Sequence, residues 1–227
     1  MNTENNFKFF IGISAIYILL ICFGYEDFAW YLKPFLLPFL FYAVVKTNEF
    51  ETKRWLLLSL LFSWIGDCVL MFADQGELYF IFGLVSFLLA HVLFIVLFVK
   101  QKSDGIHHKQ TLYWFGFSFV LVYLFGMLSL LIPSLGDLKF PVGIYAMTIS
   151  LMLIETLKGS FNWSDKSKYI MLIGAIFFVT SDSILAINKF YTAISNASFW
   201  IMITYLIALF CIVKGILKMN NNVKIGY

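Results

Sequence analysis

Several ionisable side chains of this sequence lie within long apolar stretches. They are Lys33, Asp67, His91, Glu155 and Asp182, with Asn188 and Lys189 at the end of the last such stretch. Ionisable groups in hydrocarbon are costly, and by default they mark a functional interior. Carboxyl and imidazole groups are the usual carriers of general acid–base catalysis, and ammonium groups bind phosphate.

The composition requires a bilayer around these residues. The chain has 227 residues, of which 61% are hydrophobic and 13% charged. A soluble domain is about 45–50% apolar and about 25% charged. The net charge of +3 is small and the basic residues are scattered, which argues against nucleic acid as a partner. We therefore expect an integral membrane protein surrounded by membrane lipids.

The apolar stretches predict the architecture, since a spanning helix needs about 20 mostly apolar residues. We predict an all-α, polytopic bundle of about eight transmembrane helices in a single domain, residues 1–227. The expected helices are 7–24, 28–45, 55–72, 79–99, 111–132, 140–157, 169–187 and 198–217.

The basic residues predict the orientation. Of the 16 Lys and Arg residues, all but Lys33, Lys139 and Lys189 fall on one side of this arrangement. Lys and Arg concentrate in cytoplasmic connectors. Both termini are therefore expected in the cytoplasm, and the protein in the cytoplasmic (inner) membrane of a bacterium.

Orientation then sorts the ionisable residues by depth. Lys33, Asp67 and Asp182 fall in the non-cytoplasmic half, where they could line one cavity. His91 falls near the midplane, and Glu155 close to the cytoplasmic end. Simpler interpretations remain open: Lys33 reaching the interface, the aspartates as structural partners, His91 as a packing residue and Glu155 at the interface.

Two local patterns refine this arrangement. Tyr145, Thr148, Met152 and Glu155 recur every three or four residues and so form one stripe of their helix, which makes an inward-facing Glu155 plausible. Pro34 and Pro38 lie inside the second predicted helix. A proline there leaves a backbone carbonyl that a neighbouring helix or water must satisfy, and we expect a kink.

Asp67 and Asp182 have similar surroundings. A phenylalanine precedes each by five residues, Gly66 or Ser181 comes directly before, and a leucine follows by three. A four-plus-four internal duplication is one interpretation of this similarity.

The ordered motifs resemble a known family, the lysoplasmalogenases of bacterial YhhN-like and animal transmembrane proteins. The similarity spans the second to seventh predicted helices, through Lys33-Pro34, Gly66-Asp67-x-x-Leu70-Met71, Phe82-Gly83-Leu84-x-x-Phe87-Leu88-x-Ala90-His91, Pro141-x-x-x-Tyr145-Ala146 and Gly174-Ala175-x-x-Phe178-x-x-Ser181-Asp182-Ser183-x-Leu185-Ala186-x-Asn188-Lys189-Phe190. The resemblance implies about eight transmembrane helices and hydrolysis of the vinyl ether bond of lysoplasmalogens (alkenyl-glycerophospho-ethanolamine or -choline), giving a fatty aldehyde and the glycerophospho-alcohol. It implies no metal and no organic cofactor.

The chemistry of a vinyl ether assigns expected roles. Rate-limiting protonation of carbon requires a carboxylic acid that keeps its proton, and addition of water requires a base. We expect Asp67 and Asp182 in these two roles, in either order, with His91 relaying a proton or orienting an aspartate. Substrate binding is expected at Lys33, Tyr145, Glu155, Ser181, Asn188 and Lys189, with the two lysines holding the phosphate.

Three other functions compete with this interpretation. Intramembrane Asp, His and Lys residues also serve proton- or ion-coupled transporters and channels. A zinc-dependent hydrolase of the ceramidase-like type commonly needs three protein ligands, yet His107 and His108 lie in a connector and leave only His91 in a span. A non-catalytic scaffold gives no reason for charges at one depth.

Overall fold

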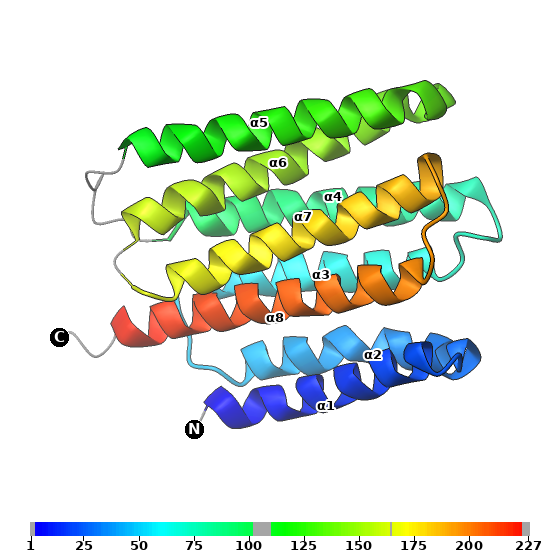
Figure 1. Cartoon of the computed structure of the whole chain (residues 1–227). Helices are drawn as coiled ribbons and strands as arrows, with labels where there is room; N and C mark the ends of the chain where they lie inside the picture. Colours follow the sequence, from blue (N-terminus) through cyan, green and yellow to red (C-terminus); the bar gives the residue numbers. More distant parts are fainter. Residues whose placement is uncertain (1–2, 102–109, 164, 224–227) are drawn as a thin grey trace. The chain divides into compact units, whose positions relative to one another are not determined.

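The computed structural model describes residues 3–101, 110–163 and 165–223, and within them every regular element is a helix. Two short 3-10 turns, Ile132–Ser134 and Gly136–Leu138, join α5 to α6. The all-helical prediction is confirmed for these residues. The α-helices (Figure 1) are α1 (Thr3–Cys22), α2 (Glu26–Val45), α3 (Lys53–Leu70), α4 (Glu77–Val99), α5 (Gln110–Leu131), α6 (Lys139–Asn162), α7 (Lys168–Phe190) and α8 (Ala197–Val223).

Six of these helices are long and apolar enough to cross a membrane: α2, α4, α5, α6, α7 and α8. The apolar part of α1 is shorter, Phe7–Cys22. The helix α3 has 18 residues and begins with Lys53 and Arg54. The structure is consistent with a helical membrane protein, whereas the eight spans and the side on which the termini lie stay predictions. His107 and His108 lie outside the described residues.

The chain divides into two compact units, Met1–Leu97 and Phe98–Tyr227. In the first unit, α2 packs against both α1 and α3. Helices α3 and α4 approach closely, because a Cβ added at Gly66 would lie 2.6 Å from the Phe87 ring, and one at Gly83 would lie 2.5 Å from Leu70. Small residues allow such contacts between membrane helices. The expected single domain is a prediction that this division leaves untested.

The prolines of α2 have a specific partner. The helix runs through both Pro34 and Pro38. Pro38 has no N–H to give to the carbonyl oxygen of Pro34, four residues earlier. The indole N–H of Trp64, on α3, donates to that oxygen at 2.7 Å. The expectation that a neighbouring helix satisfies a carbonyl left by proline is thus confirmed at Pro34.

In the second unit, α7 packs along α8, and the two helices lie side by side in Figure 1. A Cβ at Gly174 would lie 2.9 Å from both the Ala208 oxygen and the Ile212 nitrogen, which are backbone atoms of α8. A Cβ at Gly215 of α8 would lie 2.3 Å from the Met171 side chain and 3.3 Å from the Met171 backbone nitrogen, both on α7. The two backbones therefore touch where glycine lacks a side chain, and α7 is fixed firmly.

An apolar cluster closes one end of this unit. Leu131, Leu135 and Val142 are buried there, and Ala186 and Phe190 of α7 pack against them. The cluster fixes the join between α5 and α6 against the last turns of α7. The last turns of α7, just beyond Asp182, are thereby held against the joined ends of α5 and α6.

Replacing Gly174 by Ala should destabilise the protein by about 1–3 kcal/mol, because the new methyl group meets backbone atoms that cannot move aside. Gly126→Ala is the matched control, since a Cβ there meets nothing within 4 Å. Alanine also forms helix better than glycine. Thermal unfolding in detergent should show a lower midpoint for Gly174→Ala only; equal midpoints would contradict the close contact.

Trp64→Phe should cost about 1–2 kcal/mol by leaving the Pro34 carbonyl without its donor. The cost should shrink in a Pro38→Ala background, where residue 38 regains an N–H for that carbonyl. A double-mutant cycle of unfolding free energies measures the difference. Additive costs would show that the indole bond does not replace the missing helix bond.

Candidate functional site

The described residues place Asp182 in a hydrogen bond between two helices. The Tyr145 hydroxyl, on α6, donates to Asp182 Oδ2, on α7, at 2.5 Å. Both side chains are half-buried. A short bond from a neutral hydroxyl to a carboxylate is a charge-assisted bond, which is stronger than one between neutral groups. The sequence predicted Tyr145 and Asp182 separately, and the structure brings them together.

Ser183, the residue after Asp182, makes a contact with a third helix, α5. Ser183 donates to its own helix at Val179 O, 2.5 Å away. A hydroxyl has one proton, so the Tyr123 hydroxyl of α5, which also contacts Ser183 Oγ, is the donor in that second bond. Tyr123 was not among the predicted site residues. Its only signal in the sequence is a hydroxyl in an apolar helix.

Ser181, the residue before Asp182, hydrogen bonds to α8. Ser181 is buried and donates to Ile201 O at 2.9 Å. Successive residues of a helix point about 100° apart because a turn takes 3.6 residues. Ser181, Asp182 and Ser183 therefore reach α8, α6 and α5 in turn. The structure gives Ser181 a contact that positions α7, next to the carboxylate.

The two polar residues that follow have different surroundings. Asn188 Oδ1 accepts the backbone N–H of Ile194 at 2.9 Å, which fixes the loop after α7. Lys189 is exposed, in the last turn of α7. It lies seven residues beyond Asp182, or about 10 Å along the helix axis. Of the two side chains, the Lys189 ammonium group is thus the exposed one.

Glu155 lies away from this group. It forms an ion pair with Lys158 at 3.5 Å, one turn along its own helix. Ten residues, or about 15 Å of helix, separate it from Tyr145. The ion pair fits the interpretation of Glu155 as an interface residue. Tyr145 and Glu155 both lie on α6, but they have different partners. Tyr145 bonds to Asp182 of α7, whereas Glu155 pairs with Lys158 of its own helix.

The first unit contains a second charged group, around Asp67. Asp67 is 4% exposed, on α3, beside the contact between Gly66 and Phe87. Its carboxyl acts electrostatically on the buried Tyr17 of α1 and on Cys68, and Lys33 also acts on Cys68. Lys33 and Asp67 therefore share one neighbourhood, to which Tyr17 is an unpredicted addition. Their expected depth beside Asp182 stays a prediction, because Asp182 belongs to the other unit.

His91 is completely buried on α4. Its Nδ1 lies 2.6 Å from the Phe87 carbonyl oxygen, four residues earlier. A carbonyl only accepts hydrogen bonds, so Nδ1 carries the hydrogen, and Nε2 of the neutral ring is an acceptor. The Phe87 ring also contacts Gly66, next to Asp67. The backbone thus fixes one tautomer of His91, one helical turn beyond the Phe87 ring that contacts Gly66.

These arrangements are suited to proton transfer. In the described part of the chain, no three His, Cys, Asp or Glu side chains are grouped as ligands would be. A carboxyl group with a tyrosine donor can give a proton to a substrate, and the tyrosine then stabilises the carboxylate that remains.

Comparisons with known proteins agree with the motifs. The chain is 30% identical over 158 residues to the human lysoplasmalogenase TMEM86A, covering 66% of this chain and 60% of that protein. It is 30% identical over 142 residues to a lysoplasmalogenase of Mycobacterium tuberculosis, covering 61% of this chain and 51% of that protein. The chain thus matches between half and three fifths of the length of these relatives.

No solved structure matches the chain. The model of the YhhN family matches residues 28–216, which include every site residue considered above except Tyr17. A match over most of the sequence shows the family, and the chain is a member of the YhhN family.

Proposed function

We propose that this protein is a membrane hydrolase that cleaves the vinyl ether bond of a lysophospholipid. The Tyr145–Asp182 hydrogen bond is the observation that carries the proposal, since it supplies a proton donor with built-in stabilisation of its conjugate base. The two relatives named as lysoplasmalogenases support the substrate class. The products are a fatty aldehyde and a glycerophospho-alcohol.

Asp182 acts as both acid and base in the proposed reaction. Its carboxyl proton moves to the vinyl carbon remote from the ether oxygen, and the electron pair of the double bond forms the new C–H bond. This leaves an oxocarbenium ion beside the Asp182 carboxylate. A water molecule adds to the cationic carbon and gives a proton back to Asp182. The hemiacetal then splits into aldehyde and alcohol as its hydroxyl proton moves to the leaving oxygen.

Tyr145 contributes where the charge changes. Its hydrogen bond is weaker to a neutral carboxyl than to a carboxylate. The bond therefore strengthens as the proton leaves Asp182, which stabilises the transition state more than the ground state. Ser181 and Ser183 position the helix around the acid through α8 and α5. An exposed Lys189 near the end of α7 is suited to the phosphate.

A second version of the mechanism uses residues of the first unit, so that two aspartates share the proton transfers. Asp67 is a buried carboxyl that takes one of the two proton roles in this version, with His91 Nε2 as a relay. Lys33 is the corresponding phosphate ligand, while Asn188 and Glu155 act on substrate only through the loop and interface contacts described above. The membrane itself is the cytoplasmic membrane of a bacterium, with eight spans and both termini in the cytoplasm.

Asp182→Asn should lower kcat by a factor of about 10²–10⁴, because an amide cannot donate the carboxyl proton. Tyr145→Phe should lower kcat by about ten- to a hundredfold while KM changes little. The assay is release of fatty aldehyde from an alkenyl lysophospholipid by the purified protein, with an acyl lysophospholipid as the substrate control.

Tyr113→Phe is the matched control for Tyr145→Phe. Tyr113 makes ring contacts with Trp114, Phe117 and Phe161, which phenylalanine retains. It should keep the wild-type rate. Aldehyde release at the wild-type rate by folded Asp182→Asn protein would refute this chemistry, and gradient-driven flux without product would instead favour a transporter.

The Asp67→Asn variant distinguishes the mechanism in which Asp182 is both acid and base from the mechanism in which Asp67 takes one of these roles. If Asp182 is both acid and base, the variant should keep turnover within about tenfold of wild type. If the two aspartates share the steps, kcat should fall as far as in Asp182→Asn. Unfolding midpoints of both variants, measured in the same detergent, separate a lost proton donor from a lost structural partner.

A further inference from the structure

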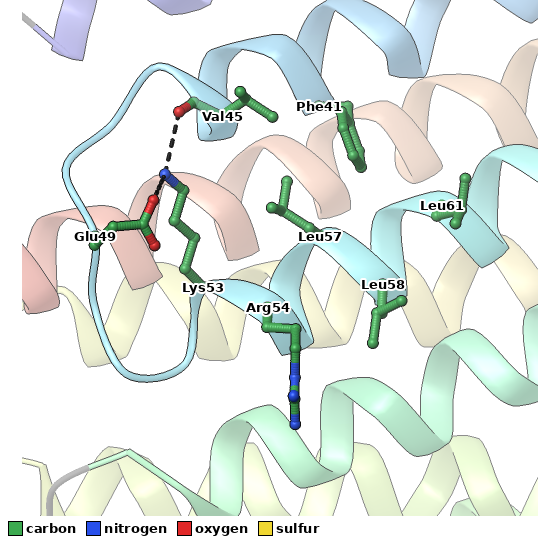
Figure 2. A pocket seen from close by; sticks show the side chains of 8 residues that line it. All are labelled: Phe41, Val45, Glu49, Lys53, Arg54, Leu57, Leu58 and Leu61. Atoms are coloured by element: carbon green, nitrogen blue, oxygen red, sulfur yellow. Dashed lines mark hydrogen bonds and ion pairs between the residues drawn. The ribbon is translucent and has the colours of Figure 1, made fainter.

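A pocket of about 340 Å³ lies where α2 ends and α3 begins, within the first unit. Figure 2 shows its lining, which comes from α2, the connecting loop and α3: Phe41, Val45, Glu49, Lys53, Arg54, Leu57, Leu58 and Leu61. The volume is within the range of ligand pockets. Most of the lining is aliphatic or aromatic, while the three charged residues gather at the loop end.

The apolar side of the pocket belongs to an exposed apolar surface. Val45 and Leu61 are 44% and 37% exposed, and the neighbouring Tyr42 is 52% exposed. An exposed apolar surface on a membrane helix faces lipid tails. The hollow between these residues is therefore open to an acyl chain.

Lys53 closes the loop and has little capacity for a ligand. Its ammonium group donates to Val45 O at 3.1 Å, to Thr47 O at 2.8 Å and to Glu49 Oε1 at 2.8 Å. An ammonium group has three N–H bonds, so all are used. Its positive charge also suits the carbonyl end of α2. Glu49 and Lys53 thus neutralise each other at one wall of the pocket.

Arg54 is the third charged residue of the pocket, and its guanidinium group can bind a ligand. In Figure 2 its side chain extends away from the loop toward which Lys53 points. Its guanidinium group lies 5.1 Å from the ring centre of Trp55. Among the described residues it has no hydrogen bond or ion pair. A guanidinium group offers five N–H donors in a fork that matches a phosphate, and tryptophan is typical of the membrane interface.

We propose that this pocket binds one acyl chain of an anionic phospholipid, whose phosphate contacts Arg54. The aliphatic wall receives the chain and the guanidinium group selects the charge. Arg54 lies thirteen residues before Asp67 on α3, or about 20 Å along the axis, so this site is separate from the Asp67 group. It does not depend on the proposed hydrolysis.

The test is retention of added lipid by the purified full-length protein, measured by native mass spectrometry. Phosphatidylglycerol should be retained about tenfold better than phosphatidylcholine. Arg54→Gln should abolish that preference, and Leu58→Trp should reduce retention of both lipids by filling the pocket.

Lys46→Gln is the matched control, because Lys46 is a basic residue at the same end of α2 that does not line the pocket and stacks on Tyr42. It should leave the preference unchanged. Equal effects of Arg54→Gln and Lys46→Gln, or equal retention of both lipids by the wild type, would overturn the proposal. Aldehyde release is measured on the same samples as a separate test of the hydrolase. A protein that releases no aldehyde can still retain lipid, so the two proposals can fail independently.

Discussion

Hydrocarbon offers no hydrogen-bond partner, so polar groups on apolar helices must find partners within the protein. The Pro34 carbonyl, left without its helix donor by Pro38, takes the indole of Trp64. Ser181 gives its hydroxyl to the backbone of α8. Asp182 receives the hydroxyl of Tyr145 from α6. Each of these bonds joins two helices, and together they fix where the helices lie and which side chains meet.

Close backbone contact is the second means of fixing the helices. Lipid tails are as apolar as leucine, so burial alone holds membrane helices together weakly, and packing has to contribute. Gly174 and Gly215 let α7 and α8 touch, and Gly66 lets α3 meet the Phe87 ring. Both contacts lie near a candidate carboxyl: Gly66 directly precedes Asp67, and Gly174 lies two turns before Asp182 on the same helix. The rigid packing therefore supports the residues proposed to react.

The polar residues of the two units differ in how they are used. Asp182 is half-buried and held by a tyrosine whose bond strengthens with charge, which suits proton transfer. Asp67 is more deeply buried, with Tyr17 and Cys68 within the electrostatic reach of its carboxyl group. At the other end of α3, the Lys53 ammonium group is bonded to the loop after α2, while the exposed Arg54 side chain lies over the Trp55 ring. Residue type alone therefore does not reveal the role of a charged side chain. Its partners decide whether the charge holds the structure together or can bind a ligand.

The helical class, the approximate helix limits and the polar positions followed from the sequence alone, because apolar length and the cost of buried charge act on each segment separately. The ordered motifs likewise indicated the family. Side-chain partners did not follow: Tyr145 for Asp182, Trp64 for Pro34, Tyr123 for Ser183 and Lys158 for Glu155. Such pairs depend on helix rotation and on spacing between helices, which distant residues such as Gly174 set. Only the tertiary structure brings those influences together.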